Sequence, residues 1–277
     1  MRYIFISDVH GQYDKLIKSL NDVGFDSKVD TIVSLGDPFD RGPHSYEILK
    51  FLMTCPNRIL VWGNHDLRLK EILIGQDIVQ SFDYSNGVLE TMKSFCQNQN
   101  INSINVGIQV LKTDDVCRRR YELLWKYFDE CVYAVEWSNL VGVHGWIPVT
   151  IDDKKTHFDK WGFLKSYCIY KYWENWRETN ASDWYEATWS HTHTFFEQKI
   201  FLPDKKLIVG HWHAWRLRLA DSKGAIVYNS LDDIDFSTFE YEDKLVAIDG
   251  CSNADQGVVN AWVYETDEVP KFIKATE

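Results

Sequence analysis

Residues 3–11 read YIFISDVHG, a short apolar run that ends in an acid and a histidine. An apolar run of this length is typical of a buried strand, here at 3–7. Asp8 and His10 therefore follow directly after a strand, where the chain leaves the sheet. Open α/β sheets bind ligands at this end of their strands. The stretch thus predicts the first strand of an α/β sheet and the start of a binding site.

The same order of elements continues through the first 74 residues. Apolar runs at 31–35 and 58–62 predict two further buried strands. Apolar residues at helical spacing predict helices at 13–23, after Pro43 and at 67–74. This alternation of strands and helices predicts a layered α/β fold.

The remainder of the chain predicts a second group of strands. Residues 75–130 are expected to be mostly helical, and short strands are expected at 131–136, 139–143, 207–209, 225–228, 244–248 and 258–264. Residues 150–200 are irregular in pattern and rich in aromatic residues. We therefore expect one domain over 1–277, a two-sheet β-sandwich flanked by helices, with a helical insertion at 75–130 and an aromatic, lid-like insertion at 150–200.

Many of the 12 tryptophans lie between Trp161 and Trp215. Large aromatic side chains usually bury, so a packed aromatic core or lid is the preferred interpretation of this segment. A surface that stacks on a substrate is the alternative.

Composition limits the possible partners and location. The formal net charge is −11, which argues against a broad basic surface, so no long nucleic acid is expected as a partner. The sequence contains no apolar stretch approaching the roughly 18 residues of a membrane helix. The six cysteines include no CxxC pair and are expected to be reduced, mostly buried thiols. We therefore expect a cytoplasmic protein.

Five predicted strands are followed by residues that bind metals. The ligand types are carboxylate, amide and imidazole, and no thiolate is among them. This mixture of hard oxygen and borderline nitrogen suits divalent Mn, Fe, Zn, Ni or Co. Two metals that share one ligand need about this many groups, and the two oxygens of Asp37 make it the natural bridge. The candidate ligands are Asp8, His10, Asp37, Asn64, His144, His211 and His213.

These motifs resemble the calcineurin-like metallophosphoesterase superfamily. The elements that carry the resemblance are DVHG at 8–11, GDPFDRG at 36–42, GNHD at 63–66, HG at 144–145 and GHWH at 210–213. Within this superfamily the chain resembles the phosphoprotein-phosphatase branch, including small bacterial and bacteriophage serine/threonine phosphatases. Its opening motifs are equally similar to those of symmetrical diadenosine tetraphosphatases. The family fold, a β-sandwich flanked by helices, agrees with the strands expected above.

The resemblance implies a role for each matching residue. Asp8 and His10 correspond to ligands of a first metal, and Asp37 to the bridging carboxylate. Asn64, His144 and His211 correspond to ligands of a second metal, and His213 to a first-metal ligand of the wider superfamily. His65 corresponds to the catalytic histidine with Asp40 as its partner, and Arg41 to the arginine that holds phosphate. Two divalent cations, manganese foremost, and a hydroxide between them are implied as the reacting machinery.

The chain departs from the family pattern at the second phosphate-binding arginine. That arginine is expected between His144 and His211, near Trp189-Ser190-His191, where the sequence has none. His191 occupies this place, and Arg177 is the nearest arginine upstream. Both are therefore candidate substrate-binding residues beside Arg41.

Three functions remain open on these grounds. The leading hypothesis is a metal-dependent phosphomonoesterase that acts on a phosphoprotein or a small phosphate ester. The first alternative is a hydrolase of dinucleoside polyphosphates or phosphodiesters, whose bases the aromatic segment would stack. The second is a catalytically silent scaffold, and the presence of every proposed ligand argues against it.

Overall fold

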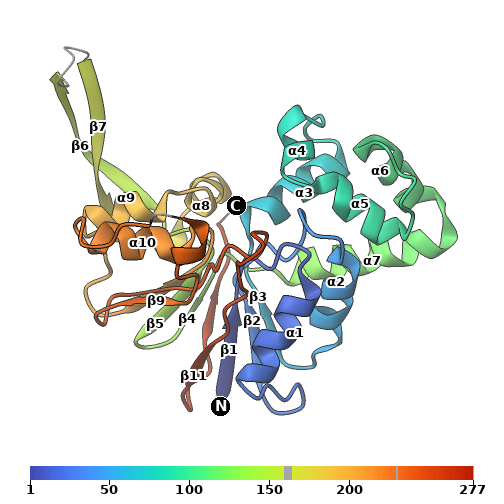
Figure 1. Ribbon diagram of the computed structural model, residues 1–277, viewed down its shortest axis with the longest axis horizontal. Helices are drawn as coiled ribbons and strands as arrows, with labels where there is room; N and C mark the ends of the chain where they lie inside the picture. Colours follow the sequence, from blue (N-terminus) through green and yellow to red (C-terminus); the bar gives the residue numbers. More distant parts are fainter. Residues whose placement is uncertain (159–163, 229, 277) are drawn as a thin grey trace.

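The computed structural model describes residues 1–158, 164–228 and 230–276 of the 277-residue chain. Its first sheet has four strands in the order β11-β1-β2-β3 (Figure 1). Strands β1, β2 and β3 run parallel to their neighbours, whereas β11 pairs antiparallel with β1. The strands span Arg2–Ile6 (β1), Thr31–Ser34 (β2), Arg58–Leu60 (β3) and Trp262–Glu265 (β11).

The second sheet has six strands in the order β12-β4-β5-β8-β10-β9. Its centre, β5-β8-β10, is parallel, and antiparallel strands flank it on both sides. The strands span Ala134–Glu136 (β4), Leu140–Val143 (β5), Lys206–Val209 (β8), Phe239–Tyr241 (β9), Leu245–Ala247 (β10) and Lys271–Ile273 (β12).

The two sheets pack face to face through buried apolar side chains. Tyr3 and Phe5 point toward the second sheet and join a cluster that includes Leu140 and Ile208 from it. Successive residues of a strand point to opposite faces, so Ile4 and its alternates pack outward against helices instead. Both faces of β1 are therefore buried, which explains why its sequence is continuously apolar rather than alternating.

Helices cover the outer face of each sheet. On the side of the first sheet lie α1 (Tyr13–Asp22), α2 (Ser45–Thr54) and α7 (Asp115–Glu130), and α5 (Val88–Cys96) and α6 (Ile104–Thr113) form a further layer packed on these helices. Against the second pack α8 (Ala181–Thr188), α9 (Thr192–Glu197) and α10 (Ala214–Asp221). The expected sandwich between helical layers is confirmed (Figure 1).

The chain has two further α-helices and two 3₁₀ turns among the described residues. They are α3 (Asn64–Ile74), α4 (Ser81–Ser85) and two 3₁₀ turns, Trp176–Glu178 and Leu231–Asp233. Across the described parts of the chain, no helix is both long and apolar enough to cross a membrane.

Two segments differ from the sequence-based expectation. Strands β6 (Val149–Phe158) and β7 (Leu164–Tyr172) form an antiparallel ribbon that projects from the body, where irregular structure was expected (Figure 1). Residues 159–163, which include Trp161, lie outside the described chain. The strand expected at 225–228 is wrong: these residues follow a turn with Gly224 at φ +88°, Val227 is exposed, and the segment joins none of the described sheets.

Phe5 provides a test of the inter-sheet core. Its side chain is fully buried between the sheets, so Phe5→Ala removes apolar contacts and leaves a cavity. We expect a loss of about 3–5 kcal/mol in the free energy of unfolding, measured by urea denaturation. Phe272→Ala is the matched control, because the Phe272 side chain is 53% exposed. Equal losses in the two variants would contradict the packing described here.

Candidate active site

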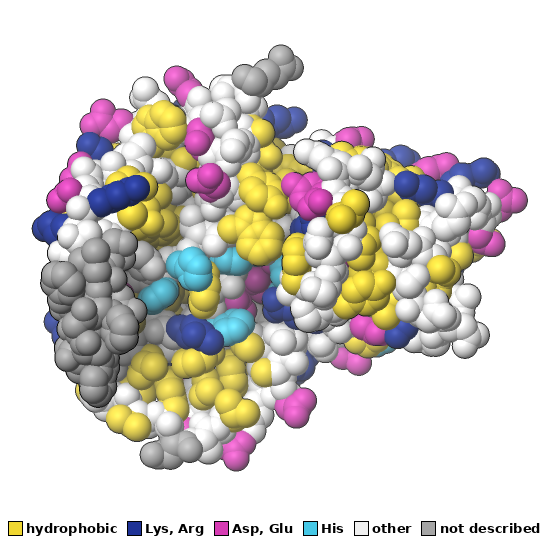
Figure 2. Space-filling view, turned by 90° about the horizontal axis from the view of Figure 1, so that it is seen from above, with side chains coloured by type: hydrophobic (Ala, Val, Ile, Leu, Met, Phe, Trp, Pro, Cys, Tyr) yellow, Lys and Arg dark blue, Asp and Glu magenta, His cyan; other side chains and the backbone are white. Residues whose placement is uncertain are grey.

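The carboxyl ends of strands from both sheets meet around one hollow. The loops after β1, β2 and β3 bring residues from the first sheet, and the loops after β5 and β8 bring residues from the second. Figure 2 shows histidines gathered in this hollow, with basic side chains beside them and acidic ones at its floor. The hollow is a cavity of about 420 Å³ lined by Asp8, His10, Asp37, Arg41, Asn64, His65, Asn86, Trp189, His211, Trp212, His213, Arg216 and Asn253.

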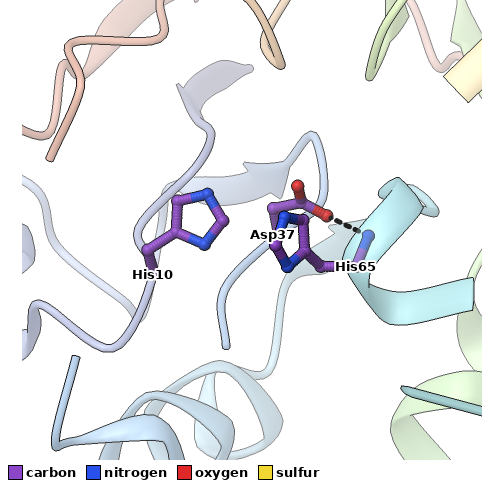
Figure 3. A group of neighbouring side chains, drawn as sticks. All are labelled: His10, Asp37 and His65. Atoms are coloured by element: carbon purple, nitrogen blue, oxygen red, sulfur yellow. Dashed lines mark hydrogen bonds between the residues drawn. The ribbon is translucent and has the colours of Figure 1, made fainter. Parts of the chain in front are cut away.

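Asp37 lies at the centre of the possible metal ligands. Among the described residues, two groups have ligand atoms within 4.8 Å of one another: His10, Asp37 and His65, and Asp37, His144 and His211. Asp37 belongs to both. Its Oδ1 accepts a hydrogen bond of 3.0 Å from the backbone N–H of His65, shown in Figure 3, and its Oδ2 lies 3.3 Å from His144 Nε2. The carboxylate is thus placed to bridge two cations.

Backbone carbonyls orient the imidazoles. His10 Nδ1 lies 2.9 Å from the carbonyl oxygen of Phe39, and His144 Nδ1 lies 2.7 Å from that of Leu35. A carbonyl only accepts, so Nδ1 carries the proton in both rings, and each Nε2 faces the site. A hydrogen bond of this kind typically fixes a histidine that binds metal through its other nitrogen.

Burial changes the protonation of these groups. It holds the pKa of His10 well below its ordinary value, and together with the neighbouring His144 it lowers the pKa of His211 to about 3. Both rings are therefore neutral, which is the form that binds metal. Burial lowers the pKa of His144 too, but Asp37 and Asp8 outweigh it and raise the value to about 10.

The buried carboxylates of this site favour the binding of a positive charge. Burial and the nearby Asp249 raise the pKa of Asp8 to about 7, and burial beside Asp37 raises that of Asp66 to about 8. Carboxylates crowded in this way are stabilised as anions by a cation. The backbone leaves room for them: a Cβ at Gly63 would lie 2.0 Å from Asp37 Oδ1. The donor set therefore fits divalent cations.

Three further sequence-predicted ligands lie at the edge of these two groups. Asp8 Oδ1 is 3.8 Å from His10 Nε2, and Asn64 Oδ1 is 2.8 Å from His144 Nε2. His213 lines the cavity, but its Nδ1 is 2.9 Å from Asp249 Oδ2 and its Nε2 is 3.4 Å from Cys251 Sγ. The structure thus brings all seven predicted ligands to one place, with His213 in contact with a partner at each ring nitrogen.

His65 and Arg41 form a connected unit beside the ligands. His65 Nδ1 is 2.7 Å from Asp40 Oδ2, and its Nε2 is 3.2 Å from the Arg41 guanidinium. Burial lowers the pKa of His65, but the nearby Asp37 and the hydrogen bond that His65 donates to Asp40 outweigh it and raise the pKa above its ordinary value. Thr91 on α5 holds Asp40 in turn: its hydroxyl donates to Asp40 Oδ1 at 2.7 Å and accepts from the Asp40 backbone N–H at 2.8 Å.

The two other predicted substrate-binding residues lie outside this cavity. Arg177 donates through Nε to Glu136 Oε2 at 2.8 Å and forms a second bond to the other oxygen, so its guanidinium fork is occupied at β4. His191 contacts Trp212 with its ring tilted by 35° and ring centroids 4.7 Å apart, and it lines a neighbouring cavity. The structure brings neither residue to the ligand cluster.

Sequence reasoning missed several residues that line the cavity. Arg216, on α10, is the most important of them, because it supplies a second guanidinium beside Arg41. It follows GHWH by only two residues, so its place after a strand-end motif was the available signal. Asn86, Trp189 and Asn253 also line the cavity and belong to no strand-end motif, and Trp212 lies within GHWH but had no predicted role.

The loop that carries Asn253 is fixed from α1. Lys15 Nζ donates to the carbonyl oxygens of Ser252, Ala254 and Gly257 at 2.9, 2.7 and 2.7 Å. The Ser252 hydroxyl donates to the carbonyl of Asp8 at 2.6 Å. The C-terminal loop is thus bound to the start of the first metal-ligand motif.

A β-sandwich with carboxylates, an amide and imidazoles at its strand ends is the architecture of a metal-dependent phosphoesterase. The model of the calcineurin-like phosphoesterase family matches residues 1–247, and the chain belongs to this family. It is therefore a metal-dependent hydrolase of phosphate esters, from a family whose members use two metals.

Curated relatives match only in part. A 76-residue segment, 27% of the chain, is 43% identical to the symmetrical bis(5'-nucleosyl)-tetraphosphatase of Klebsiella pneumoniae (strain 342) and covers 27% of that enzyme. The same enzyme from Baumannia cicadellinicola is 42% identical over 76 residues, 27% of this chain and 26% of the relative. The matched region spans about a quarter of the length of these relatives.

Solved structures agree with the fold. The cold-active protein-tyrosine phosphatase of a psychrophilic Shewanella species superimposes with a TM-score of 0.51 and 14% sequence identity. The alignment covers 99% of this chain and 80% of the other. At this identity the likeness shows a shared fold.

Asp37→Asn tests the shared ligand. An amide has one acceptor oxygen and no charge, so we expect the variant to lose both bound metal and activity. Metal content after purification with Mn²⁺ is measured by inductively coupled plasma mass spectrometry, and folding by circular dichroism. Asp204→Asn, an exposed position outside the cavity, is the control. A folded Asp37→Asn protein that keeps two metals per chain would rule out the bridging role.

Proposed function

We propose that this protein is a phosphomonoesterase that uses two divalent cations, with manganese the foremost candidate and Fe, Zn, Ni or Co as alternatives. The observation that carries the proposal is the position of Asp37, which belongs to two groups of buried ligands directly beside His65, Asp40 and Arg41. The substrate we propose is a phosphoprotein or a small phosphate ester, hydrolysed in the cytoplasm.

The ligands divide into two sets around Asp37. Asp8, His10 and Asp37, with His213 as a further candidate, would hold one cation. Asp37, Asn64, His144 and His211 would hold the other. When bound, such a pair lowers the pKa of a water to near neutrality and neutralises charge on the phosphate.

The protein's own side chains would bind and protonate the substrate. Arg41 and Arg216 line the same cavity, and a guanidinium fork suits the oxygens of a phosphate. His65 is held by Asp40 through Nδ1, so its Nε2 is the atom directed at the cavity. This nitrogen would protonate the leaving oxygen. The raised pKa of His65 supports its role as an acid.

A second candidate function is hydrolysis of symmetrical dinucleoside polyphosphates. The 43% identity of a 76-residue segment to symmetrical bis(5'-nucleosyl)-tetraphosphatases favours it. The cation ligands serve both reactions, because each attacks a phosphorus and expels an oxygen. The choice therefore rests on the groups that surround the phosphate.

A substrate panel separates the two functions. The purified protein would be supplied in turn with Mn²⁺, Zn²⁺, Ni²⁺, Co²⁺ and Fe²⁺ and assayed on p-nitrophenyl phosphate, its bis ester, a phosphoserine peptide and diadenosine tetraphosphate. We expect metal-stimulated hydrolysis of the monoesters, with release of inorganic phosphate. Preference for diadenosine tetraphosphate would select the second candidate. Absence of turnover with every metal would leave the scaffold hypothesis.

His65→Asn tests the proposed general acid. Asparagine cannot protonate the leaving oxygen, so we expect kcat on a phosphoserine peptide to fall by roughly 10²- to 10⁴-fold. Metal content should stay near that of the wild type. The loss should be smaller on p-nitrophenyl phosphate, whose leaving group needs little protonation. Wild-type turnover of the peptide by His65→Asn would refute the assigned role.

A further inference from the structure

A buried threonine of the helical segment contacts the carboxylate that holds the proposed acid. Thr91 lies on α5, and its side chain is fully buried. Its hydroxyl donates to Asp40 Oδ1 at 2.7 Å and accepts from the Asp40 backbone N–H at 2.8 Å. The other carboxylate oxygen, Oδ2, accepts from His65 Nδ1 at 2.7 Å. Each oxygen of Asp40 thus has its own partner, and Thr91 is separated from the His65 ring by Asp40 alone.

The hydroxyl of Thr91 has a fixed direction. A hydroxyl group offers one donor and two acceptor positions. Asp40 takes the donor and, through its backbone N–H, one of the acceptors. The buried Ser45 hydroxyl, at the start of α2, lies 3.2 Å from Thr91 Oγ1. Because the proton of Thr91 is already used, Ser45 is the donor in this contact, and the Thr91 proton points to Asp40 Oδ1.

These contacts differ from those of other threonines in the helices. A helical threonine commonly donates to a carbonyl of the preceding turn of its own helix. Thr113 donates in this way to Gln109 at 2.8 Å, and Thr188 to Tyr185 at 2.7 Å. Thr91 instead directs its hydroxyl out of α5, to the loop after β2. A role within its own helix therefore does not explain this hydroxyl.

The loop that Thr91 contacts has a strained backbone. The φ angles of Asp40 and Arg41 are 68° and 60°, in the left-handed region that residues with a side chain rarely adopt. Helix α5 and the residue before it contact both positions. Thr91 accepts from the Asp40 N–H, and a Cβ at Gly87 would lie 2.1 Å from the backbone nitrogen of Arg41. The helix is therefore placed to hold the backbone as well as the carboxylate of Asp40.

We propose that Thr91 is a positioning residue for proton transfer to the leaving oxygen. It holds the Asp40 carboxylate so that Oδ2 faces His65 Nδ1, and the imidazole is thereby held with Nε2 directed at the cavity. Thr91 acts through Asp40 and touches neither the phosphate nor the cations. The inference rests on the proposed role of His65 as general acid, and it gives a helix outside the strand-end motifs a part in that step.

A role in proton transfer has a consequence that a purely structural role lacks. An ester of an aliphatic alcohol, such as phosphoserine, expels a basic oxygen that needs a proton. p-Nitrophenol is a much stronger acid, so its anion leaves with little help. Loss of the Thr91 hydroxyl should therefore slow the serine ester and spare the nitrophenyl ester. General damage to the site or loss of metal would slow both.

The test measures kcat and KM, with Mn²⁺ present, on a phosphoserine peptide and on aryl phosphates from phenyl to p-nitrophenyl. Thr91→Val removes the hydroxyl at nearly constant volume. We expect its kcat on the peptide to fall by about 10- to 100-fold, with little change in KM or on p-nitrophenyl phosphate. Thr91→Ser keeps a hydroxyl and should restore most of the rate. Thr179→Val is the control, because Thr179 is 3% exposed and donates to the Trp176 carbonyl, and it should change neither rate.

Two further variants separate this inference from the proposed function. Thr91→Val should cause no additional loss in a His65→Asn background, because the two residues act in one step. Ser45→Ala, which removes only the group that orients the Thr91 hydroxyl, should give a smaller loss with the same dependence on the leaving group. It also serves as the test if Thr91→Val does not fold by circular dichroism. Equal losses on every ester, or a full additional loss in the His65→Asn background, would overturn the inference.

Nuclear magnetic resonance gives a readout that does not need turnover. In protein labelled with ¹⁵N-histidine, the signal of the His65 Nδ1–H is identified by its absence from His65→Asn. We expect this signal to shift or disappear in Thr91→Val and to remain in Thr91→Ser. An unchanged signal in Thr91→Val would refute the positioning role. If His65→Asn keeps wild-type turnover, the proposed acid is wrong, and this signal still decides whether Thr91 holds the Asp40–His65 pair.

Discussion

The site depends on one buried interaction, the contact of the Asp37 carboxylate with both sheets. From the first sheet it accepts a hydrogen bond from the backbone N–H of His65, and from the second it lies 3.3 Å from His144. Burial alone would raise the pKa of Asp37, but His144 and His65 hold it well below the ordinary value. A buried anion is stable only when its partners are held in place. The packing of the two sheets therefore stabilises the negative charge of Asp37 at their common edge. A displacement of one sheet relative to the other would separate the two groups of candidate ligands.

The loops around that carboxylate are conformationally strained. Positive φ angles occur at Asp8 (51°), His10 (47°), Asp37 (56°), Asp40 (68°), Arg41 (60°) and His211 (63°). A residue with a side chain is disfavoured there, at a cost on the order of 1–3 kcal/mol each. Backbone hydrogen bonds between the loops offset this cost: Asp8 donates to Gly36, His10 to Asp37, and Gly42 to His10. Each loop thus stabilises the strained form of its neighbour, and together they direct the ligands into one cavity.

The strand ends and the polar residues that follow them could be predicted from the sequence, because both depend on local pattern. Apolar runs such as 3–7 and 31–35 identified buried strands, and the polar residue after each run marked the shared edge. The remaining site residues arrive through tertiary packing. Thr91 reaches Asp40 from a helix more than fifty positions away, and no local pattern distinguishes it from another helical threonine. The position of the Arg177 side chain could not be predicted for the same reason. Arg177 is near the expected arginine in sequence, but the sequence does not show that it pairs with Glu136. The residues expected to form a strand at 225–228 have a suitable pattern, but they follow a turn and Val227 is exposed, so their pattern did not show that they pack on neither sheet.

Part of the cavity wall comes from two segments that carry none of the strand-end motifs. Asn86 and the Thr91 contact to Asp40 belong to the helical segment 75–130, and Trp189 belongs to the aromatic segment 150–200. Gly87 packs so closely that a Cβ there would lie 2.1 Å from the backbone nitrogen of Arg41. The helical segment is thus part of the site, since Thr91 contacts the partner of His65 and Gly87 packs against the backbone of Arg41. In the proposed function, the strand ends would hold the cations and the phosphate, whereas these two segments would contact the group attached to the phosphate. Substitutions in the cavity walls can therefore change the substrate while the residues at the strand ends stay the same. For this reason the strand-end motifs indicate the class of reaction, whereas the substrate depends on wall residues such as Trp189.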